Sequence, residues 1–308
     1  MRKRDNMIDL HIHTTYSDGE DTVIEILKKA KENKLEVISI TDHNSCLSYI
    51  EMEKFNIEDY YKGKIIVGCE FTTSFDKRGI EILGYNLDYK LIQEKMNKLY
   101  TYENINKRTI TLYNRLIDKI HNLGFKTSLN FVDDNFDFMG KYYDHIIFKD
   151  LLSFDENIKL LKENKWNTID DFFRNGLANP TSKIFINPSE FNPTLKETID
   201  LIHEAGGITF LAHPYQYRFN NTLLFLEKIF SEYDLDGIEC FYSTFTKEEI
   251  KNIIDFAKKR NLLISGGSDY HGKIKKNKLG IGLGNLCVNY NIIKNWNVDF
   301  YKKNKKDY

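Results

Sequence analysis

The stretch that decides the fold is Asp9-Leu10-His11-Ile12-His13-Thr14, which ends a short apolar run that begins at Ile8. The side chains of His11 and His13 are two residues apart, so both point to the same face of a β-strand. Two imidazoles at this spacing can bind one metal ion. A histidine at a strand end is more often structural when it stands alone. The interpretation therefore depends on the residues at the ends of the other strands.

Apolar, β-branched runs recur along the chain and end in polar residues, a pattern typical of buried β-strands. Amphipathic helix patterns at residues 22–34, 195–204 and 247–260 lie between several of these runs. Strands that alternate with helices favour β/α units around a parallel sheet or barrel. The strands predicted in this way are residues 8–13, 37–43, 65–73, 80–87, 208–213, 237–242, 262–271 and 285–290.

The middle of the chain departs from this alternation. A long predicted helix at residues 91–123 opens it, and an aromatic, asparagine-rich and irregular stretch comes next. No clear parallel strand appears until Ile208. We therefore expect an α/β chain whose sheet is interrupted by a mainly helical insert that covers the site as a lid. The predicted parts are a barrel segment at residues 1–90, the insert at 91–193, a second barrel segment at 194–292 and a polar tail at 293–308.

The overall charge of the chain limits the kinds of molecule that it is expected to bind. The 44 Lys and Arg residues nearly balance the 45 Asp and Glu residues. Because the whole molecule offers no field that attracts polyanions, phosphate must be recognised at a local site, and long nucleic acids are not expected as partners. No stretch approaches the length of apolar residues that spans a membrane, and no signal peptide is recognisable. The four cysteines form no C-x-x-C motif, which favours reduced thiols and a cytoplasmic location.

Histidines and acids also stand at the ends of the other predicted strands. Asp269 and His271 are again two residues apart, and His213 ends its own strand. In β/α barrels the loops after the strands hold the active site, so these residues should converge. Imidazole and carboxylate suit Zn, Mn or Fe, and their number exceeds what one ion needs. The candidate metal ligands are His11, His13, Asp18, His43, Glu70, Glu81, His213, Asp269 and His271.

Other polar residues near these motifs are interpreted as structural. Asp42 points to the strand face opposite His43, which indicates a turn or wall residue. Glu239 suits a supporting role at least as well as ligation. His121 and His203 lie in helical patterns without partners at ligand spacing. The sequence contains neither a P-loop nor a G-x-S-x-G motif, which excludes those two chemistries.

Six motifs occur in a recognisable order, at residues 9–14, 17–19, 40–43, 68–70, 212–214 and 267–272. Together they resemble the PHP (polymerase and histidinol phosphatase) family. Within that family, the chain is similar to the branch of nucleoside 3′,5′-bisphosphate phosphatases and RNase AM-like metal-dependent phosphoesterases. The resemblance implies a PHP fold, a distorted, TIM-like (β/α)7 barrel with a mainly helical insert.

The resemblance also implies two or three divalent metal ions, with Glu70 bridging the first and the second. At position 81 the family usually has His, whereas this chain has Glu, and a carboxylate favours harder ions such as manganese or iron over zinc. The implied ligands are His11, His13, Glu70 and Asp269 for the first ion, Glu70, His213 and Glu81 for the second, and Asp18, His43 and His271 for the third.

The expected reaction is hydrolysis of a phosphate ester. A metal-bridging water, with its pKa lowered towards neutral, would attack phosphorus in line. The catalytic candidates are Glu70, as the bridging carboxylate, and His213 or His271, to orient water or protonate the leaving group. Two alternatives stay open: an amidohydrolase-type C–N hydrolase, which also begins with H-x-H, and a metal-binding PHP module without catalysis.

The expected substrate is a nucleotide, a short oligonucleotide or a small phosphorylated metabolite, and the insert would choose among them. Related proteins have an Arg two residues before a substrate-facing His. Here His145 aligns with that His, Tyr143 stands at the Arg position, and Lys141 is a substitute without the guanidinium fork. The candidate substrate contacts are Lys141, His145, Lys183 and Arg218.

Overall fold

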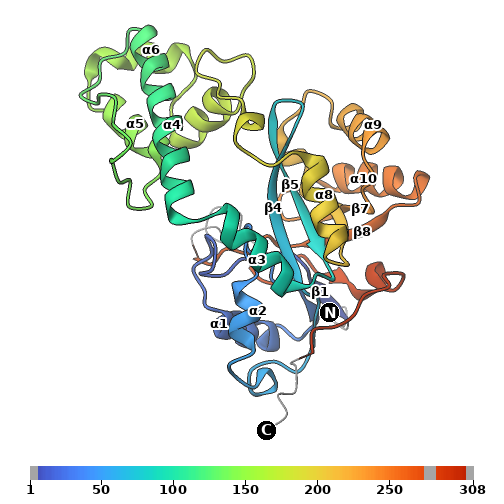
Figure 1. The fold of residues 1–308 in the computed structure, drawn as a ribbon. Helices are drawn as coiled ribbons and strands as arrows, with labels where there is room; N and C mark the ends of the chain where they lie inside the picture. The colour runs from blue at the N-terminus through green and yellow to red at the C-terminus, as the bar shows by residue number, and fades with distance from the viewer. Residues whose placement is uncertain (1–5, 274–281, 303–308) are drawn as a thin grey trace. The chain divides into compact units, whose positions relative to one another are not determined.

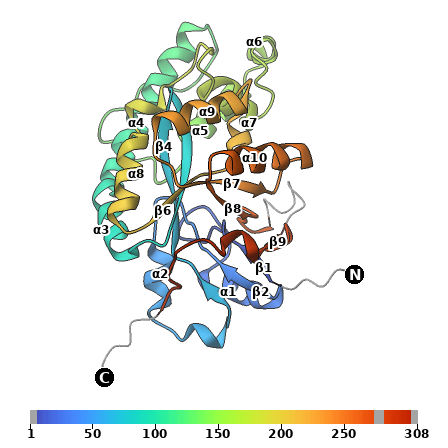
Figure 2. The same cartoon turned by 90° about the vertical axis from the view of Figure 1, so that its right-hand side faces the viewer.

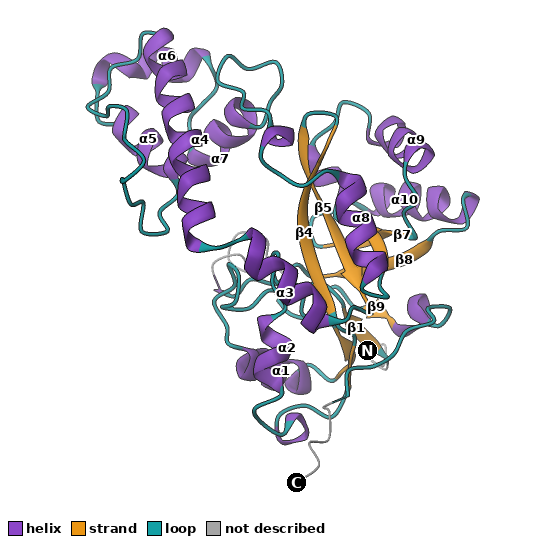
Figure 3. Cartoon of the chain, in the orientation of Figure 1, coloured by secondary structure: helices purple, strands orange, loops and turns teal. Residues whose placement is uncertain are grey.

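The computed structural model describes residues 6–273 and 282–302 (Figure 1). The chain forms two compact units. The first comprises residues 1–73, 80–96 and 194–308, and the second comprises residues 74–79 and 97–193. Figure 3 shows that the long stretch of the second unit is built from helices and loops, whereas the first unit contains most of the strands.

One sheet of the first unit has four strands in the order β3-β2-β1-β9. β1 pairs in parallel with β2, and β2 pairs in parallel with β3, but β1 pairs with β9 in antiparallel fashion. The central pair, β1 and β2, is mostly apolar, and every residue of it except Glu36 is buried, as is typical of parallel strands. The bounds are β1 Met7–Asp9, β2 Leu35–Ile38, β3 Lys64–Ile65 and β9 Val288–Asn289.

The other sheet has five strands in the order β4-β5-β6-β7-β8. β6, β7 and β8 are parallel, whereas β5 runs antiparallel to β6. β4 and β5 are joined by Asp76 and Lys77, whose φ angles of 50° and 61° form the two-residue turn that tight hairpins favour. The bounds are β4 Gly68–Phe75, β5 Arg78–Tyr85, β6 Ile208–Leu211, β7 Gly237–Tyr242 and β8 Leu263–Gly267 (Figure 2).

Two single bridges join the two sheets near the strand ends. Ile12 bridges Tyr270, and His43 bridges Glu70, both in parallel orientation. The fold is thus a mixed α/β arrangement of two sheets. The expectation that all strands run parallel is wrong for β5 and β9, because a two-residue hairpin and the returning end of the chain impose antiparallel pairing. The strand pairing among the described residues does not by itself close a barrel.

Three helices of the first unit begin with the same local device. Thr22, Thr194 and Thr246 each cap a helix, and a Glu three residues later closes a capping box. α8 packs against β6, and α10 packs against β7 and β8. The helices predicted at residues 22–34, 195–204 and 247–260 are thereby confirmed. The bounds in this unit are α1 Val23–Glu32, α2 Leu47–Met52, α3 Tyr89–Leu99, α8 Leu195–Glu204, α9 Thr222–Glu232 and α10 Lys247–Lys259, with 3-10 turns at Ile57–Asp59, Pro214–Tyr217 and Tyr290–Ile293.

The second unit has its own apolar core, in which Trp166 and Phe172 are buried against α4. The single helix predicted at residues 91–123 is wrong. Thr101 adopts an extended conformation and accepts a hydrogen bond from the amide of Asn104, so a new helix starts there. The bounds are α4 Tyr102–Asn122, α5 Tyr143–Leu151, α6 Ile158–Glu163 and α7 Ile169–Asp171, with a π-helical turn at Phe172–Leu177 and 3-10 turns at Asp155–Asn157 and Pro188–Glu190.

No helix among residues 6–273 and 282–302 is long and apolar enough to cross a membrane.

Substitution of the residue that caps α10 tests the capping box. Thr246→Ala should lower the free energy of unfolding by about 1 kcal/mol, because the amide of Glu249 loses its acceptor. Urea denaturation followed by circular dichroism measures this difference. Thr246→Ser keeps the hydroxyl and should retain most of the stability; equal losses in both variants would contradict the capping role.

Candidate metal centre

The polar residues that follow the strands of the first unit gather in one cluster. Both histidines of the opening motif are fully buried, and Glu70 is 1% exposed. The members of the cluster come from six of the strands described above or from the loops after them. They are His11 and His13 after β1, Asp18 in the next loop, His43 after β2, Glu70 in β4, Glu81 in β5, His213 after β6, and Asp269 and His271 after β8.

Glu70 stands at the centre of the cluster. Its Oε2 lies 3.2 Å from Nε2 of His11 and 3.2 Å from Nε2 of His13. The same oxygen lies 3.3 Å from Nδ1 of His43. Its other oxygen, Oε1, lies 2.9 Å from Nε2 of His213. Because each oxygen faces a different set of imidazoles, this carboxylate has the arrangement needed to bridge two ions.

Asp269 completes the group around the opening histidines. Its Oδ1 lies 3.3 Å from Nε2 of His13 and 3.5 Å from Nε2 of His11. Ligands at about 2.0–2.2 Å from a common ion stand roughly 3.0–3.5 Å from one another, given the metal–ligand distances usual in proteins. The separations in this group therefore match those of a metal site, and the donor set of imidazole and carboxylate fits zinc, manganese or iron.

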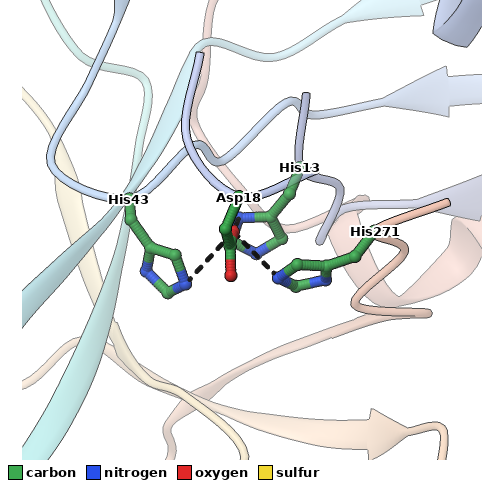
Figure 4. A group of neighbouring side chains, drawn as sticks. All are labelled: His13, Asp18, His43 and His271. Atoms are coloured by element: carbon green, nitrogen blue, oxygen red, sulfur yellow. Dashed lines mark ion pairs between the residues drawn. The ribbon is translucent and has the colours of Figure 1, made fainter. Parts of the chain in front are cut away.

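A second group surrounds Asp18 (Figure 4). Its Oδ1 lies 3.1 Å from Nε2 of His271, 3.6 Å from Nδ1 of His13 and 3.7 Å from Nε2 of His43. The Asp18 side chain is 44% exposed, in contrast to the buried Glu70. Solvent therefore reaches the cluster at Asp18, and it also reaches Glu81, whose side chain is 27% exposed.

Glu81 forms the third group, with Glu70 and two imidazoles. Its Oε2 lies 3.2 Å from Nε2 of His213, and its Oε1 lies 3.7 Å from Nδ1 of His43. The carboxylate at this position thus reaches the cluster, and it brings an oxygen donor where the family usually has a nitrogen.

Several buried ring nitrogens have no hydrogen-bond partner among the residues that the structure describes. They are Nε2 of His11, Nε2 of His13, Nδ1 of His43 and Nδ1 of His213. Leaving buried polar atoms unpaired is costly, and native structures rarely do so without a ligand or water to satisfy them. These orphaned nitrogens fit a cluster built to hold ions.

The acids also change the proton affinity of the imidazoles. Burial alone would lower the pKa of His13, but the nearby carboxylates of Asp269 and Glu70 outweigh it and raise the pKa to about 9. Burial acts in the same way on His213, where Glu70 and Glu81 raise the pKa to about 10. Burial would raise the pKa of Glu70, but the charges of His11 and His43 hold it well below its usual range. Without metal, protons therefore balance the charge that ions would otherwise balance.

Asp42 shapes the loop that leads to one of the ligands. It accepts hydrogen bonds from the amide and hydroxyl of Thr14, both at 2.7 Å, and from the Ser17 hydroxyl at 2.7 Å. It thereby orders the loop that carries Asp18. The sequence indicates a turn or wall position for Asp42, and these contacts show what that position supports.

Asp9 joins the first and the last strands of the molecule, and the sequence pattern indicated no role for it. It accepts hydrogen bonds from the amide and hydroxyl of Ser268 at 2.9 Å and 2.6 Å, and from the amide of Gly284 at 2.8 Å. In the sequence, only the position of Asp9 beside the H-x-H motif points to a role for this residue. Its partners are more than 250 residues away in the sequence, which is why the signal carried no meaning by itself.

The backbone is strained at two of the candidate ligands. His213 has a φ of 22° and Asp269 a φ of 52°, in a region that non-glycine residues seldom occupy. Such strain often marks functional sites, where the surrounding contacts hold an unfavourable conformation in place.

None of the candidate substrate contacts is a member of this cluster. Lys141, His145 and Lys183 are exposed residues of the second unit, and Arg218 is an exposed residue of the first. Their role in binding substrate stays a prediction. His203 pairs with Asp236 at 3.0 Å, away from the candidate ligands.

Comparison with known proteins now identifies the family. Residues 9–208 match the PHP domain, and the chain belongs to the PHP domain family. The resemblance inferred from the six motifs is thus confirmed.

Two relatives act on phosphate esters, according to their names. A 5′-3′ exoribonuclease of Haemophilus influenzae is 27% identical over 272 residues, which cover 85% of this chain and 89% of that protein. A phosphoribosyl 1,2-cyclic phosphate 1,2-diphosphodiesterase of Eggerthella lenta is 23% identical over 268 residues, covering 86% of this chain and 94% of that protein.

Two solved structures share the fold. A candidate metal-dependent phosphoesterase from Bifidobacterium adolescentis has a TM-score of 0.59 and 22% identity, over 94% of this chain and 95% of its own. An amidohydrolase from Chromobacterium violaceum, solved with sulfate and without metal, has a TM-score of 0.58 and 19% identity, over 86% of this chain and 87% of its own. At these identities the likeness establishes the fold alone.

The raised pKa values predict how the metal-free protein responds to pH. His13 and His213 titrate at about 9 and about 10 in the folded state, against about 6.5 for an unperturbed histidine. The folded state therefore keeps protons that the unfolded state has lost. This stabilisation is complete below about pH 6.5 and disappears as the pH rises through the folded pKa values.

Urea denaturation of chelator-treated protein between about pH 7 and about pH 9.5 should thus show a falling free energy of unfolding. Metal-loaded protein serves as the control, because bound ions replace the protons and remove this source of pH dependence. A flat profile for the metal-free protein would contradict this proton balance.

Proposed function

We propose that this chain is a metal-dependent phosphoesterase whose centre holds two or three divalent ions. The observation that carries the proposal is the position of Glu70, whose two oxygens face separate groups of imidazoles. Asp18 and His271 add a further group on the exposed side of the cluster. A centre with a shared carboxylate and several ions is the arrangement that enzymes use to displace groups at phosphorus.

The ligand assignment follows the family resemblance, and it overlaps with three compact groups of the cluster without being identical to them: His13, Asp18, His43 and His271; His11, His13 and Glu70; and His43, Glu70 and Glu81. We assign His11, His13, Glu70 and Asp269 to the first ion, Glu70, His213 and Glu81 to the second, and Asp18, His43 and His271 to the third. We also propose that the strands form the distorted (β/α)7 barrel that the resemblance implies, with barrel segments at residues 1–90 and 194–292 and an insert at residues 91–193.

When bound, divalent ions lower the pKa of a water molecule and neutralise charge on the phosphate. The chain supplies the remaining tasks. Nδ1 of His271 lies 3.0 Å from the carbonyl oxygen of Asp269, which leaves Nε2 directed towards the exposed Asp18. His271 and His213 are the residues that we expect to orient water or protonate the leaving oxygen.

The substrate that we propose is a nucleotide, a short oligonucleotide or a small phosphorylated metabolite. The names of the two relatives cover both ends of this range, from ribonucleic acid to a cyclic sugar phosphate. The near-neutral charge of the chain supports a short substrate over a long nucleic acid. Lys141, His145, Lys183 and Arg218 are the proposed contacts. Their individual replacement by Ala, with KM measured against kcat, tests this assignment.

The amidohydrolase alternative has one observation in its favour, the shared fold with the protein from Chromobacterium violaceum. Amidohydrolase barrels typically bridge their two metals with a modified lysine, whereas here Glu70 lies between the imidazole groups. Asp18, His43 and His271 also have no ready role in a two-metal amidohydrolase. Phosphoester hydrolysis is therefore the function that the cluster supports best.

Removal of the opening histidines tests the proposed centre. His11→Ala combined with His13→Ala should abolish both metal loading and turnover, because two ligands of the first ion are lost. Metal analysis and hydrolysis of bis-p-nitrophenyl phosphate measure the two effects. His121→Ala removes an exposed helical histidine and should leave both unchanged. Full activity in the double variant would refute the proposal.

Glu81 should set the preference of the second ion. Glu81→His replaces a hard oxygen donor by a nitrogen donor, so competitive loading with Mn²⁺ and Zn²⁺ should shift towards Zn²⁺ relative to the original chain. Elemental analysis after removal of unbound metal gives the ratio. An unchanged ratio would show that Glu81 does not ligate.

A further inference from the structure

β7 provides none of the candidate ligands, yet two of its side chains contact residues of the cluster. Glu239 is fully buried, and Tyr242 is 4% exposed. Glu239 contacts His11 and His213, and Tyr242 contacts Asp269. Each contact involves one defined atom of a candidate ligand. These contacts explain why the polar side chains of Glu239 and Tyr242 are buried in this strand.

A β-bulge places both residues on the same side. Glu239 and Tyr242 are three positions apart, so in a regular strand their side chains would point to opposite faces. In the pairing with β8, Glu239 lies opposite Ser265, but Phe241 lies opposite Gly266, which leaves Cys240 as the extra residue. A bulge of this kind re-aims the side chains after it, and bulges are common beside active sites.

Glu239 holds two ligand residues at once. Nδ1 of His11 lies 3.0 Å from Oε1 of Glu239, and the backbone amide of His213 donates to Oε2 at 2.8 Å. The first contact keeps a proton on Nδ1, so that Nε2 is the nitrogen left to face Glu70 and Asp269. The second contact supports His213 in its strained backbone conformation.

Tyr242 contacts only one of the two carboxylate oxygens of Asp269. Its hydroxyl donates to Oδ2 at 2.6 Å, while Oδ1 faces Nε2 of His13 at 3.3 Å. The tyrosine ring also packs against His213, with ring centroids 5.1 Å apart.

We propose that β7 is the positioning strand of the metal centre, in which Glu239 and Tyr242 each bind one atom of a ligand so that the other atom faces the ion. This role rests on the first ion of the proposed function. Glu239 selects the nitrogen that His11 presents, and Tyr242 leaves Asp269 a single oxygen. Oδ2 of Asp269 is thereby held by Tyr242, which would leave room at a bound ion for water or substrate.

The test measures metal binding directly. Metal-free protein is titrated with Co²⁺, and affinity is obtained from calorimetry and the visible spectrum of the bound ion. Tyr242→Phe removes only one oxygen atom, so the fold is retained while Oδ2 of Asp269 becomes available. Glu239→Gln keeps the shape but loses the charge and one acceptor. Each variant should weaken the tightest site by about 10–100-fold, the usual effect of losing a hydrogen-bond partner of a metal ligand.

The spectrum separates positioning from general damage. In Tyr242→Phe, a second oxygen of Asp269 joins the coordination, and the absorption of bound Co²⁺ should weaken as the coordination number rises. Tyr61→Phe is the matched control: it removes a buried hydroxyl that donates to the carbonyl of Leu35 at 3.1 Å, away from the ligands. That control should keep the original affinity and spectrum.

The outcomes distinguish this role from the proposed function. If the original chain binds no Co²⁺, the metal centre and the positioning role both fail. If it binds Co²⁺ and Tyr242→Phe binds with the same affinity and the same spectrum, the positioning role fails while the metal centre stands. If Tyr61→Phe changes the spectrum as much as Tyr242→Phe, the effect is not specific and the role is likewise refuted.

Discussion

The constraint on which the rest of the structure depends is the burial of the Glu70 carboxylate. A charge removed from water is tolerated only where opposite charge or hydrogen-bond donors compensate it closely. Glu70 meets this requirement with imidazoles at distances of 2.9–3.3 Å. Those imidazoles come from the ends of β1, β2 and β6, so these strand ends must meet at one place. The strand order of the two sheets brings these strand ends together.

The supporting acids form a distinct layer around this centre. Asp9, Asp42 and Glu239 are each fully or almost fully buried, and each accepts hydrogen bonds from backbone amides near the ligands. They fix loops, whereas Glu70 and Asp269 face the imidazoles. Because burial of acids without such donors would be costly, the loops and the supporting acids stabilise one another. Tyr242 extends the layer with a neutral donor that comes from β7.

The sequence predicts the parts of this arrangement that depend on local periodicity. The spacing of His11 and His13, and the strands before His213 and Asp269, can be inferred from alternation and apolar runs, and the structure brings these residues together. The parts that depend on pairing partners were not predictable. Neither the bulge at Cys240 nor the antiparallel pairing of β9 leaves a mark on its own segment. The break at Thr101 competes with a strong helical pattern that continues on both sides of it.

The hydrogen bonds of Asp9 with Ser268 and Gly284 have a consequence for how the cluster assembles during synthesis of the chain. During synthesis, the first ligands leave the ribosome when the last strands do not yet exist. His11 and His13 then lack Asp269, and Asp9 lacks both of its partners. The cluster can therefore be completed only after residue 269 has emerged, and a chain interrupted before that residue lacks one of the ligands that we propose for the first ion. On the proposed ligand assignment, metal binding at the first site would follow the synthesis of Asp269.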